Sequence, residues 1–217
     1  MKDVLYFLLE VGKLKNIKRK GVTFYGIKSP DSATDHTFRM AMMVWLLAGK
    51  KKKIHIRKSL KMALIHDLCK IYTGDITPYN GLLPKEKKRR YKFVRSWRRL
   101  PLSQKRKMHI EKLKKEKQAL KKLTACLSNA FKKEVLDLWS EYQKGKSPEA
   151  KFVSQIDVIE NLIEAFEWWK KDKKFPTKPW WEHADEVVDD PILLEFIRTI
   201  AEEELEELEK LKRKKRK

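Results

Sequence analysis

The fold is decided by the stretch Met62-Ala63-Leu64-Ile65-His66-Asp67-Leu68-Cys69-Lys70. Apolar residues in and just before this stretch recur at the spacing of one helix face, namely Leu60, Ala63 and Leu64. The helix ends in His66 and Asp67, so two polar side chains come where the apolar core is expected to continue. A buried charge needs a partner, and a metal ion is a common one. The stretch therefore predicts a core helix that ends in two candidate metal ligands.

The same helical spacing extends along most of the chain. It occurs at positions 4, 8 and 11, at positions 40, 43, 44 and 47, and behind two helix-start signals, Ser147-Pro148 and Asp190-Pro191. Glycine and proline number only 7 and 8 in 217 residues, which disfavours a turn-rich β fold. These features predict an all-α bundle, organised as a single domain over residues 1–217.

Positive charge is concentrated in one segment. The chain carries a formal net charge of +22, and residues 85–125 hold 18 Lys or Arg against 3 Asp or Glu. Pro101 should divide this segment into two helices, so we expect a basic helical elaboration of the bundle. Residues 210–217 form a second basic run, which we expect to fray. An excess of this size attracts polyanions, although a charge run is usually a solvated face.

Cysteine usage and apolar runs indicate the compartment. Cys69 and Cys126 fall in no metal-binding or disulfide-framework spacing. The longest apolar stretch, residues 40–48, is well short of the roughly 20 residues of a membrane span. The apolar run at residues 4–9 ends at Glu10 and is too short for a signal peptide. We therefore expect a cytoplasmic protein without a membrane partner.

Four residues together form a candidate metal site: His36, His66, Asp67 and Asp157. Two imidazoles and two carboxylates suit Mn, Co, Zn, Fe or Ni better than Mg or Ca. A lone His-Asp dipeptide is mostly chance, so the support comes from position. Asp157, like the dipeptide, interrupts an apolar stripe, because Ile156 and Ile159 flank it. One divalent ion at these residues is the expected cofactor.

Four segments carry a family resemblance: residues 32–40 (SATDHTFRM), 62–70 (MALIHDLCK), 73–78 (TGDITP) and 150–157 (AKFVSQID). In content, order and spacing they resemble the HD-domain 5'-deoxynucleotidases of the YfbR type, with residues 91–113 as an insertion. The resemblance implies an all-α HD-domain bundle, a homodimer, and one divalent metal at the four residues named above. It also implies hydrolysis of deoxyribonucleoside 5'-monophosphates to the deoxynucleoside and phosphate.

Two further residues are expected to take part in catalysis. Asp75 lies in a Gly-Asp-Ile-Thr-Pro turn that can bring its carboxylate back over the metal, although a turn aspartate is the alternative. Lys70 stands four residues after His66, where the family typically carries a glutamate that handles the attacking water. An ammonium there adds repulsion toward a dication and accepts no proton. Three explanations fit a lysine at this position: a slower enzyme, a nucleotide-binding protein without catalysis, and a chain altered to trap a complex. The alternative is that the Lys70 side chain extends to solvent and takes no part in the site.

The resemblance also implies a nucleotide-binding set. Arg19 matches an arginine of the sugar pocket, but Val22 stands where the family generally has tryptophan, which puts the preference for deoxyribose in question. Asp31 and Thr77 are the other expected substrate ligands, and the alternative for Asp31 is a cap of the helix that carries His36. Asp35, three residues after Ser32, fits a capping box at the start of the helix that carries His36.

The function expected first is a metal-dependent phosphohydrolase that removes the 5'-phosphate of nucleoside monophosphates. The second is a catalytically weak binding protein that holds nucleotides or nucleic acid through the basic segment, in which Tyr91, Phe93 and Trp97 are interleaved with Arg and Lys. A phosphodiesterase for a cyclic nucleotide or oligonucleotide is the third. Phosphate release and metal content together distinguish the first from the second.

Overall fold

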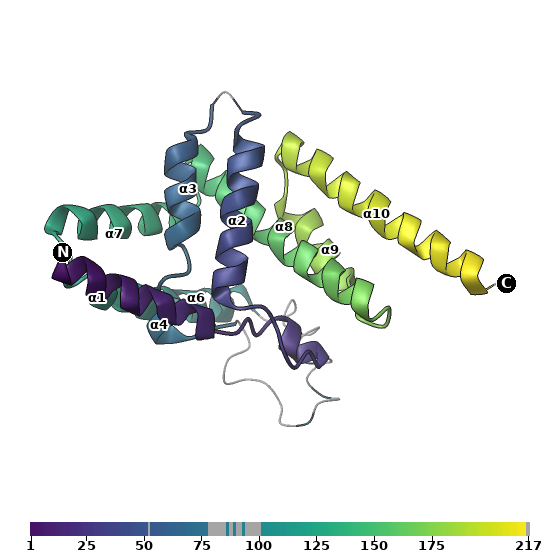
Figure 1. The fold of residues 1–217 in the computed structure, drawn as a ribbon, viewed down its shortest axis with the longest axis horizontal. Coiled ribbons are helices and arrows are strands. Elements are labelled where there is room, and N and C mark those ends of the chain that lie inside the picture. The colour runs from purple at the N-terminus through teal and green to yellow at the C-terminus, as the bar shows by residue number, and fades with distance from the viewer. Residues whose placement is uncertain (52, 78–85, 87–88, 90–92, 94–100, 216–217) are drawn as a thin grey trace. The chain divides into compact units, whose positions relative to one another are not determined.

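A computed structural model describes residues 1–51, 53–77, 86, 89, 93 and 101–215 (Figure 1). Within those residues the structure is helical, and one isolated antiparallel bridge pairs Lys18 with Ser32. The all-α prediction is confirmed. The helices in chain order are α1 (Lys2–Val11), η1 (Gly12–Asn16), η2 (Val22–Tyr25), α2 (Ala33–Ala48), α3 (Ile56–Ile65), α4 (Lys70–Thr73), α6 (Leu102–Leu123), α7 (Asn129–Lys144), α8 (Pro148–Lys171), α9 (Lys178–Val187) and α10 (Pro191–Lys215).

The helices form two compact units. The first comprises Met1–Phe38 and Leu64–Ser140, and the second comprises Arg39–Ala63 and Glu141–Lys217. Each unit therefore combines an early and a late part of the chain. A single domain over residues 1–217 stays a prediction.

The core of the first unit is built around the turn that follows α3. Leu68 and Cys69 in that turn pack in one apolar cluster with residues from η1, α2, α6 and α7, namely Leu14, Ala33, Ala119, Leu120, Leu123, Val135 and Trp139. Helix α4 packs against α6 and η1, and α1 against η1. Because Leu68 and Cys69 are buried, the backbone of the residues just before them is held in place.

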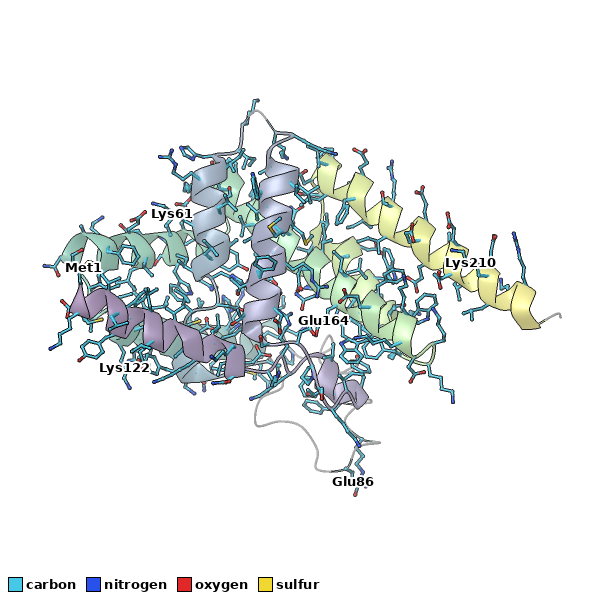
Figure 2. The ribbon with its side chains drawn as sticks, in the orientation of Figure 1. Met1, Lys61, Glu86, Lys122, Glu164 and Lys210 are labelled. Carbon is cyan, nitrogen blue, oxygen red and sulfur yellow. The ribbon has the colours of Figure 1, made fainter. Side chains whose placement is uncertain are left out.

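Helix α6 is the described part of the basic elaboration. It begins at Leu102 directly after Pro101, as predicted. One face is buried through Ala119, Leu120 and Leu123, while the opposite face is rich in lysine. Lys122, labelled in Figure 2, places its ammonium 4.4 Å from the centre of the Tyr72 ring. The predicted stacking residues Tyr91 and Trp97 lie outside the described residues.

The second unit is organised on α8, which packs against both α9 and α10 (Figure 1). The predicted helix start is confirmed, because Ser147 Oγ accepts a hydrogen bond of 3.2 Å from the Ala150 N–H and Pro148 is the first helical residue. Phe152, Ile156 and Ile159 are fully buried, as expected of a core helix. Helix α10 continues through the basic run as far as Lys215.

The predicted apolar face of α3 is corrected by the structure. Leu64 is 52% exposed, and the buried residues of the helix are Ser59, Met62 and Ala63. Ser59 can be buried because its hydroxyl donates a hydrogen bond of 3.2 Å to the carbonyl of His55. Positions 59, 62 and 63 therefore form the buried face of α3.

The described helices lack the length and apolar content needed to cross a membrane. Both cysteines are free thiols, Cys69 buried and Cys126 exposed.

Candidate metal centre

His36 is positioned by the capping box that the sequence predicted. Ser32 donates to Asp35 Oδ2 from its N–H at 2.7 Å and from its hydroxyl at 2.8 Å, and its Oγ accepts from the Asp35 N–H at 3.2 Å. These reciprocal bonds satisfy donors at the start of α2 and determine where its first turn lies. His36 follows directly and is buried in the first unit.

His66 and Asp67 lie in a turn rather than in a continuing helix. Helix α3 ends at Ile65, the Leu68 N–H donates to its carbonyl at 3.1 Å, and the Lys70 N–H donates to the Asp67 carbonyl at 2.9 Å. The turn is anchored by Leu68 in the core cluster. Both polar side chains are consequently held inside the first unit, where each is buried.

His36, His66 and Asp67 converge on one point. The two Nε2 atoms are 3.2 Å apart, and Asp67 Oδ2 lies 3.4 Å from His66 Nε2 and 3.9 Å from His36 Nε2. One ligand atom from each residue lies within 4.8 Å of the others. Two donors that each lie about 2.1 Å from one ion are about 3.0–3.4 Å apart. The donor set and its spacing therefore fit a divalent metal of the Zn, Mn, Fe, Co or Ni type.

Lys70 reaches this cluster, so the alternative in which it extends to solvent is wrong. Its Nζ lies 2.7 Å from Asp67 Oδ2 and 2.8 Å from Asp75 Oδ1, and its side chain is 14% exposed. The other Asp75 oxygen, Oδ2, accepts a hydrogen bond of 2.7 Å from the Lys20 N–H. Two carboxylates from segments before and after α4 are thus joined by one ammonium.

The electrostatics of the three groups follow from their burial and mutual charge. Burial by itself would raise the pKa of Asp67, but the His66 imidazole and the Lys70 ammonium outweigh it and hold that pKa well below its usual range. Burial would likewise raise the pKa of Asp75, which Lys70 and the Lys20 N–H lower instead. Burial by itself would lower the pKa of Lys70, but the negative charges of Asp67 and Asp75 outweigh it and raise that pKa. The structure therefore holds two carboxylates and one ammonium in their charged forms.

The remaining predicted site residues are placed as follows. Asp157 lies on α8 in the second unit, where Tyr142 donates to its Oδ2 at 2.9 Å and Asn161 to its Oδ1 at 3.0 Å. Arg19 and Thr77 are buried in the first unit. The Arg19 N–H donates to the Asp31 carbonyl at 3.0 Å. Asp157 as a ligand, and Arg19, Asp31 and Thr77 as nucleotide contacts, stay predictions.

One acidic residue of this region was missed in the sequence. Glu116 on α6 is buried, and burial raises its pKa despite Lys112 Nζ at 3.5 Å, with the Asp67 charge adding to the rise. It lies within the basic segment of residues 85–125, where lysines surround it in the sequence. Its spacing to Ala119, Leu120 and Leu123 is that of a single helix face, which was the available signal.

The fold is helical, and two buried histidines and an aspartate meet in it from separate segments. These features are those of helical proteins that bind a metal ion. Residues 11–183 match the HD domain family, and the chain belongs to it. The 5'-deoxynucleotidase HDDC2 of Dictyostelium discoideum is 34% identical over 184 residues, which cover 82% of this chain and 84% of that protein. The protein of the same name from Danio rerio is 33% identical over 168 residues, 77% of this chain and 70% of that protein.

A solved structure gives an independent comparison. A conserved hypothetical protein from Pyrococcus furiosus superposes with a TM-score of 0.65 at 26% sequence identity, covering 90% of this chain and 98% of the other.

Proposed function

We propose that this protein is a metal-dependent phosphohydrolase that removes the 5'-phosphate of deoxyribonucleoside monophosphates. The observation that carries the proposal is the buried convergence of His36, His66 and Asp67 in a chain of the HD domain family. The names of the two HDDC2 relatives supply the substrate class. The expected cytoplasmic location and homodimer belong to the same proposal.

Different residues of this chain are proposed to bind the metal and to accept the proton. His36, His66 and Asp67, with Asp157 as a fourth ligand, would hold the metal. A divalent ion bound there supplies positive charge to a phosphoryl oxygen and lowers the pKa of a water molecule. Asp75 accepts the proton of the attacking water, whose oxygen bonds to phosphorus as the bond to the 5'-oxygen breaks, and the released 5'-oxygen takes up a proton from solvent. Because its pKa is lowered, Asp75 is a weak proton acceptor, which favours slow turnover.

Lys70 and the buried Arg19 are the cations proposed to act on the phosphate. Lys70 Nζ forms its ion pairs at the edge of the cluster, and Arg19 brings a permanent charge to the same unit. Asp31 and Thr77 are proposed to contact the rest of the nucleotide.

The test measures metal content and phosphate release together. Purified protein is loaded with Mn, Co, Zn, Ni or Mg and supplied with deoxyribonucleoside and ribonucleoside monophosphates. We expect release that a chelator abolishes, and we expect Asp67→Ala to lose both metal and release. Asp137→Ala is the matched control, because Asp137 forms an exposed pair with Lys133 on α7 at 2.7 Å. Full metal content in folded Asp67→Ala would show that the proposed centre is wrong.

A second candidate function, polyanion binding, is favoured by the exposed face of α6. Lys107, Lys114, Lys117 and Lys121 lie along that face, and none of them pairs with an acidic side chain in the part of the chain that the structure describes. Unneutralised cations in a row suit the phosphates of a nucleic acid strand. This function is compatible with catalysis elsewhere on the chain.

A further inference from the structure

We propose that Lys70 is a resident cation of the metal centre. Its ammonium holds Asp67 and Asp75 together when the metal is absent and competes with the metal for Asp67 when it is present. Metal binding then requires Lys70 to give up one of its two partners. The inference rests on the metal centre of the proposed function and assigns a role to a residue of this chain.

One carboxylate oxygen of Asp67 faces both the histidines and Lys70. Asp67 Oδ2 lies 3.4 Å from His66 Nε2 and 3.9 Å from His36 Nε2, and it also lies 2.7 Å from Lys70 Nζ. A metal ligated by that oxygen would lie within about 5 Å of the ammonium, given metal-oxygen distances near 2.1 Å. A dication and an ammonium at that separation in a buried site repel each other. The affinity for metal is therefore reduced for as long as Lys70 stays in place.

In the metal-free protein, two buried carboxylates need a cation. Asp67 and Asp75 are both largely shielded from water, with side chains 10% and 12% exposed. Two such carboxylates destabilise the folded state unless a cation lies between them. Lys70 is that cation, so the site stays assembled without metal.

The backbone of Lys70 is held where the side chain can reach both Asp67 and Asp75. Its N–H donates to the Asp67 carbonyl at 2.9 Å, and its carbonyl accepts from the Gly74 N–H at 2.8 Å. The preceding residue, Cys69, is 1% exposed in the core cluster. The backbone is thus anchored on both sides, so only the side chain of Lys70 has to be ordered when it reaches the two carboxylates.

The test replaces the charge and keeps the length of the side chain. Lys70→Met is compared with the unchanged protein by calorimetric titration with manganese ions alone and by thermal unfolding with and without them. We expect the affinity for manganese to rise at least tenfold and the metal-free melting temperature to fall. The gain in melting temperature on adding manganese should then be larger in the variant, because metal replaces the missing cation. Lys70→Arg, which keeps the charge, should retain the low affinity.

A matched lysine controls for the loss of any buried ion pair. Lys58 also lies between two carboxylates, 2.5 Å from Glu141 and 3.4 Å from Glu149, in the second unit. Lys58→Met should lower the metal-free melting temperature and leave manganese affinity within about twofold. Lys70→Gln serves if Lys70→Met does not fold.

The outcomes separate this inference from the proposed function. Manganese binding of equal affinity in Lys70→Met and the unchanged protein would overturn the inference and leave the metal centre standing. Absence of manganese binding in both proteins would overturn the metal centre itself, and the inference with it.

Discussion

Glu116 shows how one buried side chain can make stability depend on pH. It is 3% exposed on α6, Lys112 pairs with it from one turn away, and Asp67 and Lys70 act on it from the neighbouring turn. Burial raises its pKa above the usual 4.5. The folded protein therefore holds this proton more tightly than the unfolded chain does. The stability that the protonated Glu116 contributes is complete below pH 4.5, the usual pKa. It is lost as the pH rises through the raised pKa of the folded protein.

Glu116→Gln keeps the shape of the side chain and cannot ionise. We expect the metal-free variant to melt at a higher temperature than the unchanged protein at about pH 8, and the difference to vanish toward about pH 4. Each unit by which the pKa is raised corresponds to about 1.4 kcal/mol at high pH. Glu111→Gln, an exposed glutamate on the same helix, is the control and should show no such trend. A variant less stable than the unchanged protein at high pH would contradict the assignment.

At the scale of an element, α6 combines a buried face with a face of unpaired lysines. The buried face joins the core through Ala119, Leu120 and Leu123, so the helix position is determined by packing. Four lysines then project from a rigid support at helical spacing. Lysines on one face of a packed helix can contact several phosphates at once, and the salt dependence of affinity distinguishes such a binding face from a solvated charge run.

If α6 binds single-stranded nucleic acid, affinity should fall log-linearly with salt. Four phosphate contacts predict a slope of about −3, at roughly −0.7 per contact. Replacing Lys107, Lys114 and Lys121 with Glu should weaken binding and flatten the slope in a fluorescence anisotropy titration. A triple variant at Lys133, Lys178 and Lys210, which pair with acidic residues, changes the net charge equally and serves as control. Equal loss in both variants would show that net charge, and not this face, binds the strand.

At the scale of the whole molecule, large apolar side chains are left exposed in the second unit. Trp45 is 60% exposed and Leu46 is 64% exposed, side by side on α2. A contiguous exposed apolar patch is typical of an interaction surface, and we propose that these two side chains belong to one. They provide a physical reason for the homodimer that the family resemblance implies.

Light scattering should accordingly give about twice the 25.9 kDa mass of one chain. Changing Trp45 and Leu46 to Asp should convert the protein to a folded monomer, because two charges would be buried in the interface. Leu102→Asp is the control, since Leu102 is 70% exposed at the start of α6. A monomeric unchanged protein at micromolar concentration would contradict the dimer.

Local features of this protein could be predicted from the sequence. The Ser32–Asp35 capping box, the Ser147-Pro148 start of α8 and the start of α6 after Pro101 all occur as expected. Each depends on backbone dihedral angles and hydrogen bonds within about four residues, which neighbouring side chains control directly. The motifs around His36 and His66 likewise identified two residues that meet in the structure.

Tertiary structure alone decided which side chains share a buried space. It selected Ser59 over Leu64 as a core residue of α3, buried Glu116 in a run of lysines, and paired Lys70 with Asp67 and Asp75. The polar partners of Ser59 and Lys70 are close to them in the chain, whereas the burial of these side chains depends on helices that are far apart in it. Helical periodicity shows which side chains share a helix face, but it carries no information about which face the distant helices will cover.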